Sequence, residues 1–156
     1  MMRLALFVCT FGGVGYSPVA PGTAGSAAGL VVYAVLRLAG ASPVVEALVI
    51  AVIIVAGVWS GTMAERHFGT TDPGPGVIDE VAGMLVTLYA LPAGWVIAIA
   101  GFFLFRVLDV FKPFPAQQFE RLHGGLGMMA DDLMVAIYGN LLLRVALWLL
   151  PGVFFV

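Results

Sequence analysis

Six apolar runs, separated by turns rich in glycine and proline, constrain the fold of this chain more than any other feature. At ~1.5 Å of rise per residue, about 20 helical residues cross the hydrocarbon core of a bilayer. Because backbone amides in lipid must form hydrogen bonds within their own segment, each run predicts a helix. The predicted helices occupy residues 2–11, 25–38, 44–59, 81–91, 95–110 and 133–150.

The composition favours lipid as the surroundings of this chain. Its 156 residues are 62% hydrophobic and 10% charged, with a mean hydropathy of +1.07. An ordinary globular domain is roughly 45–50% apolar and about 25% charged, so a soluble chain of this composition could not cover its surface with polar groups. We therefore predict an all-α fold, a single domain over residues 1–156 that forms a multi-pass membrane helical bundle. The runs at 2–11 and 81–91 are too short to span, and we expect them to be half-inserted or buried by neighbours.

Polar residues gather in three long loops, and two short turns alternate with them. The loops are 12–26, 64–80 and 111–132, and the turns are 40–43 and 91–94. Two membrane passes separate each successive pair of loops, so the topology places all three loops on one side of the membrane. That side carries Arg66, Lys112 and Arg121, and such an excess of basic residues favours the cytoplasm. We predict a multi-pass protein of a bacterial-type inner membrane with these loops in the cytoplasm.

Five carboxylates fall in or beside the polar loops, at Asp79, Glu80, Asp109, Asp131 and Asp132. Two pairs are expected at helix starts, where acids can simply cap the helix. However, acids at a membrane boundary are costly unless they are paired, solvated or bound to a cation. Mutual repulsion among five of them requires a counter-charge, and Mg²⁺ prefers oxygen ligands. We therefore predict a divalent metal site formed by these five residues, with Asp109 either a ligand or the base.

Arg106, Asp109 and Lys112 recur every three residues before Pro113 and lie along one stripe of the predicted helix. The stripe could be an internal ladder of salt bridges at an interface. It could equally bind phosphate, because arginine provides two parallel donors and lysine a point charge. We favour the phosphate clamp, because the stripe leads into the loop that precedes Asp131.

The segment 12–26 is rich in glycine, proline and hydroxyl residues and runs directly into a helix. Free backbone amides at a helix start form a seat for anions. We predict that Thr23 and Ser26 take part in such a seat. The simpler alternative is that one of these two residues is only the N-cap of the helix.

Together these stretches resemble the phosphatidylglycerophosphatase A family. The matching segments are GYSPVAPGTAGS (15–26), DPGPGVIDEVAG (72–83), FRVLDVFKPFP (105–115) and GGLGMMADDLMVAIYGN (124–140). The resemblance implies an all-helical bundle that removes the terminal phosphate of phosphatidylglycerophosphate with Mg²⁺, giving phosphatidylglycerol and inorganic phosphate. The chain departs from the family pattern at Gly127-Met128-Met129 and at Val135-Ala136. These changes leave the ionisable residues intact, so we expect them to affect packing.

The resemblance and the residue pattern together assign roles to the polar residues. The predicted catalytic residues are Asp79, Asp109 and Asp131. The predicted metal ligands are Asp79, Glu80, Asp109, Asp131 and Asp132. The predicted phosphate-binding residues are Thr23, Ser26, Arg106 and Lys112. Whether water or a carboxylate attacks phosphorus stays open, as does the oligomeric state.

Two other functions need to be weighed against this hypothesis. A CDP-alcohol phosphotransferase would need an Asp-x-x-Asp-Gly series that the chain lacks. A non-catalytic membrane protein that binds or transports ions would also use acids, but near the membrane midplane and in broken helices. The partners we expect are a phospholipid substrate and the lipid bilayer. Nucleic acid is not expected, because a net charge of −2 leaves no basic stripe for a duplex.

Overall fold

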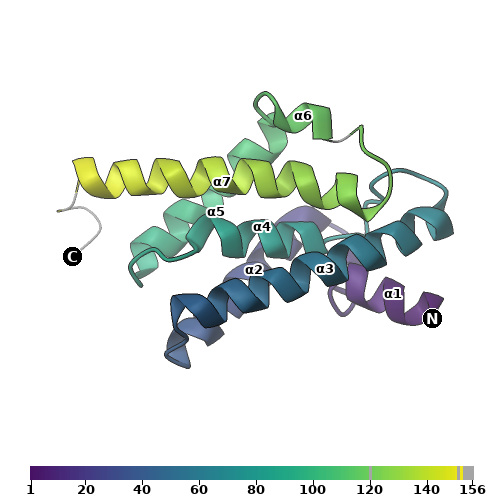
Figure 1. Ribbon diagram of the computed structural model, residues 1–156, viewed down its shortest axis with the longest axis horizontal. Helices are drawn as coiled ribbons and strands as arrows, with labels where there is room; N and C mark the ends of the chain where they lie inside the picture. Colours follow the sequence, from purple (N-terminus) through teal and green to yellow (C-terminus); the bar gives the residue numbers. More distant parts are fainter. Residues whose placement is uncertain (120, 151, 153–156) are drawn as a thin grey trace.

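The computed structural model describes residues 1–119, 121–150 and 152, and these residues form seven α-helices and one 3₁₀ helix (Figure 1). No strand occurs among them, which confirms the predicted all-α class. The helices are α1 (Met2–Cys9), η1 (Val14–Tyr16), α2 (Pro21–Leu38), α3 (Pro43–Phe68), α4 (Ile78–Leu88), α5 (Trp95–Phe111), α6 (Ala116–Phe119) and α7 (Gly125–Leu149).

Helices α3 and α7 are long and apolar enough to cross a membrane. Only 22% of the apolar stretch of α3 and 28% of that of α7 is buried inside the protein. The core helix of a soluble protein would be mostly buried, so these two helices expose their apolar side chains as membrane helices do. With 8 and 11 residues, α1 and α4 are as short as the sequence predicts. The chain is therefore a membrane protein in which some helices are too short to span.

Two long helices extend further than the apolar runs indicate. Helix α3 continues past Trp59 to Phe68 and ends at Gly69, which adopts a left-handed conformation. Helix α7 begins at Gly125, so Asp131 and Asp132 lie inside the helix, beyond its first turn. Our expectation that these two acids stand at the start of the last helix is wrong. Asp79 and Glu80 do lie in the first turn of α4, as predicted.

The early start of α7 depends on side chains of another helix. Thr62 and Glu65, both on α3, accept hydrogen bonds from the first backbone amides of α7. The Gly124 N–H lies 2.6 Å from Glu65 Oε2, and the Gly125 N–H lies 2.9 Å from Thr62 Oγ1. These bonds satisfy amides that have no partner within their own helix. They also fix the start of α7 against α3.

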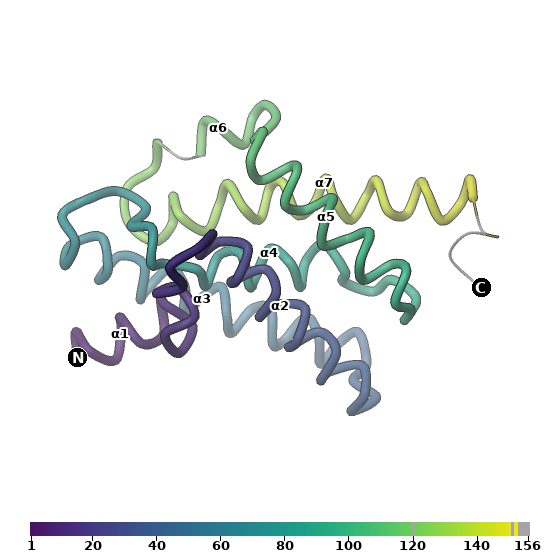
Figure 2. Tube along the Cα trace, turned by 180° about the vertical axis from the view of Figure 1, so that it is seen from behind, coloured from purple at the N-terminus to yellow at the C-terminus, as the bar shows by residue number. Residues whose placement is uncertain are grey.

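Helix α4 lies in the middle of the bundle, between α2, α3, α5 and α7 (Figures 1 and 2). Nine of its eleven residues are buried. Asn140 Nδ2 donates to the carbonyls of Val86, Thr87 and Tyr89 at distances of 3.0–3.2 Å, and Arg144 donates to Tyr89 O at 3.1 Å. A helix end in an apolar region needs such partners, because water is not available there. A short helix can therefore end inside the protein.

A second polar cluster lies at the end of the bundle where α4 ends, far from the long loops. Arg37 forms a 3.1 Å ion pair with Glu46, which is only 3% exposed. Arg37 also donates to Leu91 O, and its guanidinium lies over the ring of Tyr33. These contacts join α2 and α3 to the α4–α5 turn and neutralise the charge of Glu46.

Glycine allows α3 and α7 to approach closely. A Cβ atom on Gly125 would lie 2.2 Å from Val58 O, which is backbone and cannot move aside independently. A Cβ atom on Gly57 would lie 2.4 Å from Met129 Sδ. Small residues therefore set the spacing of these two long helices, as is common in membrane proteins.

We predict that Gly125→Ala destabilises the protein by about 1–3 kcal/mol, because the added methyl group forces the helices apart. The matched control is Gly74→Ala, since a Cβ there meets nothing within 4 Å. The free energy of unfolding, measured by denaturant titration in detergent, should fall for the first variant alone. Equal stabilities of the two variants would contradict this packing.

Candidate active site

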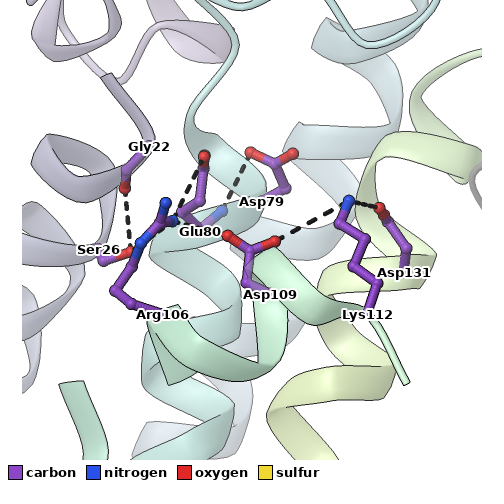
Figure 3. Close-up of polar contacts among 8 residues, drawn as sticks. All are labelled: Gly22, Ser26, Asp79, Glu80, Arg106, Asp109, Lys112 and Asp131. Carbon is purple, nitrogen blue, oxygen red and sulfur yellow. Dashed lines mark hydrogen bonds and ion pairs between the residues drawn. The ribbon is translucent and has the colours of Figure 1, made fainter. Parts of the chain in front are cut away.

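Helices α2, α4, α5 and α7 bring most of the predicted site residues close to one another (Figure 3). Asp79 and Glu80 come from the first turn of α4, and Arg106 and Asp109 come from the last part of α5. Lys112 directly follows α5 in a left-handed conformation, with φ of 40°. The remaining residues are Ser26 of α2 and Asp131 and Asp132 of α7. Acids that are far apart in the sequence therefore meet in space.

Asp79, Glu80 and Asp132 form the most crowded part of the site. One carboxylate oxygen from each lies within 4.8 Å of the others. Asp79 is 5% exposed and Asp132 is 3% exposed. Burial, and then the charge of Glu80, raises the pKa of Asp79 well above its usual value. The group is therefore costly to ionise without a nearby cation.

The oxygen atoms of this group fit a hard divalent cation. Glu80 Oε2 and Asp132 Oδ2 are buried and accept no hydrogen bond from the described residues. Buried polar atoms without partners are unusual in folded proteins. Three closely spaced carboxylates are the ligand type that Mg²⁺ and Ca²⁺ bind. The group defined by Asp79, Glu80 and Asp132, called here the acidic triad, could therefore hold a metal ion.

Asp109 lies between two basic side chains. Arg106 Nη1 donates to Asp109 Oδ2 at 2.7 Å, and Lys112 Nζ lies 3.9 Å from Asp109 Oδ1. Each cation also contacts a second helix: Lys112 pairs with Asp131 of α7, and Arg106 lies 3.4 Å from Ser26 Oγ of α2. The predicted stripe thus exists as a ladder of i, i+3 ion pairs at an interface of three helices, and its role as a phosphate clamp stays a prediction.

The five predicted metal ligands fall into two groups. Asp79, Glu80 and Asp132 form the acidic triad, while Asp109 and Asp131 are paired with Arg106 and Lys112. Arg106 joins the two groups, because its Nη1 lies 4.0 Å from Glu80 Oε1. The roles of Asp109 and Asp131 as metal ligands stay predictions.

The start of α2 lies directly against these charged groups. The N-cap of α2 is Ala20, so the alternative that Thr23 or Ser26 caps the helix is wrong. The Ala24 N–H donates to Ala20 O at 3.1 Å, which leaves the amides of Gly22 and Thr23 before the first helical hydrogen bond. The part played by Thr23 in phosphate binding stays a prediction.

Sequence reasoning missed Gly22 as a site residue. A Cβ atom there would lie 2.3 Å from Glu80 Oε1 and 3.1 Å from Arg106 Nη1. Ser26 Oγ donates to Gly22 O at 3.0 Å, which fixes the hydroxyl beside Arg106. Only glycine allows α2 to approach the acids this closely. The available signal was the Pro-Gly pair at the helix start, which is compatible with many roles.

The chain is similar to a family of known proteins. The sequence profile of the phosphatidylglycerophosphatase A family matches residues 7–147. Phosphatidylglycerophosphatase A of Escherichia coli K12 is 38% identical over 127 residues, which cover 80% of this chain and 73% of the relative. The protein of the same name from Haemophilus influenzae is 34% identical over 142 residues, covering 88% and 86% of the two chains.

A third relative has a different name. A protein of Bacteroides thetaiotaomicron, provisionally named a phosphatidylinositol-3-phosphatase, is 34% identical over 155 residues, which cover 94% of this chain and 96% of the relative. No solved structure matches the chain.

We predict that millimolar Mg²⁺ raises the melting temperature of the purified protein, because a ligand that binds only the folded state stabilises it. In Asp132→Asn this rise should largely disappear. The melting temperature of the variant without metal should not fall, since the change removes one of three crowded charges. NaCl at equal ionic strength is the control for general screening. An undiminished Mg²⁺ effect in the variant would contradict the assignment of the acidic triad.

Proposed function

Because the chain belongs to the phosphatidylglycerophosphatase A family, we propose that it removes the terminal phosphate of phosphatidylglycerophosphate with Mg²⁺ as its cofactor. The products are phosphatidylglycerol and inorganic phosphate. Family membership confirms the predicted enzyme class, a hydrolase of a phosphoric monoester. The structural observation that carries the proposal is the acidic triad beside two cations, Arg106 and Lys112.

Asp79, Glu80 and Asp132 would hold the metal ion. The close spacing of their oxygens supports this choice over the full set of five acids. When bound, Mg²⁺ would polarise the phosphoryl group and neutralise charge that develops on its oxygens.

The protein's own donors would bind the phosphoryl oxygens. Arg106 offers parallel N–H donors and Lys112 a point charge, and both already lie within 4.0 Å of an acid in the site. The free amides of Gly22 and Thr23 add donors at the positive end of α2. Asp131 holds Lys112 in place through their ion pair.

We assign Asp109 as the general base. It contacts both cations and would lie next to a phosphoryl group bound by them. It would accept a proton from the attacking water as the water oxygen bonds to phosphorus. The bond between phosphorus and the glycerol oxygen then breaks, and that oxygen takes up a proton.

The location that we propose is a bacterial-type inner membrane, with the site facing the cytoplasm. The loops that lead into α4 and α7 lie at the same end of the bundle, opposite the α2–α3 and α4–α5 turns (Figure 1). Helices α3 and α7 are unbroken, whereas transporters place their acids in broken helices. This architecture favours an enzyme over the transport alternative.

We predict that Asp109→Asn lowers the rate of phosphate release by at least about 100-fold, the range found for loss of an acid–base group. Asp131→Asn should also lower this rate, because Lys112 loses the carboxylate that holds it in place. Phosphate released from phosphatidylglycerophosphate in detergent would be measured with Mg²⁺ and with EDTA. Helicity and melting temperature would verify that each variant is folded. Full activity in a folded variant would refute the role of that residue.

The Bacteroides relative supplies a competing substrate for the same assay. We expect a higher kcat/KM for phosphatidylglycerophosphate than for phosphatidylinositol 3-phosphate, because the two relatives named phosphatidylglycerophosphatase A share the family of this chain. A reversed preference would contradict the proposed substrate and leave the phosphatase class intact.

A further inference from the structure

An open groove of about 560 Å³ lies where α5 gives way to α6, outside the acidic triad. Its lining comprises Val110, Phe111, Lys112, Gln117 and Arg121. Among these residues the ionisable side chains are Lys112 and Arg121, and both are basic. The groove is therefore suited to an anion, and the amide of Gln117 adds a neutral hydrogen-bonding group.

One side chain, that of Lys112, contacts both the groove and the candidate active site. Lys112 lines the groove, and its Nζ pairs with Asp131 and lies 3.9 Å from Asp109 Oδ1. Lys112 is thus shared by the groove that Arg121 lines and by the site that contains Arg106. An anion in the groove would lie next to a phosphate bound in that site.

The rim of the groove is apolar and exposed. Val110 and Phe111, which line the groove, are each 73% exposed, and Phe114, close to them in the sequence, is 78% exposed. Large apolar side chains exposed together mark a surface that contacts a partner or lipid. Basic residues beside such side chains are suited to phospholipids, whose anionic head groups lie next to acyl chains.

We propose that this groove binds the internal phosphodiester of the lipid substrate, with Arg121 and Gln117 as its recognition residues. The inference rests on the proposed function. Phosphatidylglycerophosphate carries a phosphodiester and a terminal phosphate joined by a glycerol unit, which matches two anion positions that share Lys112. The apolar rim directs the acyl chains into the bilayer. The groove consequently selects lipids whose phosphate is borne on an extended head group, over phosphatidate, which has no diester.

The test compares Arg121→Gln with Arg66→Gln. Arg66 is exposed at the end of α3 and does not line the groove, so the control removes the same charge from the same side of the protein. The two substrates are phosphatidylglycerophosphate and phosphatidate with identical acyl chains, in identical detergent micelles. Arg121→Gln should lower kcat/KM about tenfold for the first substrate, mainly through KM, as loss of one charged hydrogen bond does. Hydrolysis of phosphatidate should not change, and Arg66→Gln should behave as wild type.

A second measurement uses phosphatidylglycerol, which has the diester and lacks the terminal phosphate. Its Kd, measured by titration against the purified enzyme, should rise about tenfold in Arg121→Gln and stay constant in Arg66→Gln. Equal loss on both substrates, or an unchanged Kd for phosphatidylglycerol, would overturn the inference. Failure of the wild-type enzyme to hydrolyse phosphatidylglycerophosphate would refute the proposed function, and the Kd would still test the groove.

Discussion

Repulsion between buried carboxylates is the constraint on which the rest of the structure depends. Asp79, Glu80 and Asp132 place three oxygens within 4.8 Å of one another, and two oxygens of the group have no hydrogen-bond partner among the described residues. Such an arrangement is costly in an apolar protein unless a cation compensates for it. Arg106 reaches only the edge of the group, at 4.0 Å from Glu80, because it is paired more closely with Asp109. A metal ion bound by the triad would compensate for this cost.

The short helix α4 places two of these acids, Asp79 and Glu80, in the site. A spanning helix would place its first turn at the membrane surface, whereas α4 is enclosed by its neighbours and can begin where α5 and α7 carry their own charged residues. Its other end is satisfied by Asn140 and Arg144, so the bundle tolerates a helix that stops in an apolar region. Glycines on α2 let that helix pack against α4 at a distance that places Gly22 beside Glu80. Helix α4 thus provides both the surface against which α2 packs and two of the acids in the site.

The sequence predicts the helical class, the short helices and the residues that converge, because hydrophobic runs and clustered charges are local signals. It does not predict where α7 begins, since Thr62 and Glu65 of α3 supply the acceptors for its first amides. For the same reason, the prediction that Asp131 lies at the start of the last helix is wrong. The spacing of Arg106, Asp109 and Lys112 indicates a shared stripe, but the pairing of Lys112 with Asp131 depends on how α5 and α7 cross. Gly22 was missed because its role arises only from contacts with α4 and α5.

The measurement that tests this account most directly is anomalous diffraction from crystals of the protein grown with Mn²⁺, a substitute for Mg²⁺ that shares its preference for oxygen ligands. The account predicts a peak within coordination distance of oxygens from Asp79, Glu80 and Asp132, with Arg106 and Lys112 facing the ion across the space for a phosphate. A peak elsewhere in the protein, with these three carboxylates protonated and bonded to one another, would contradict it.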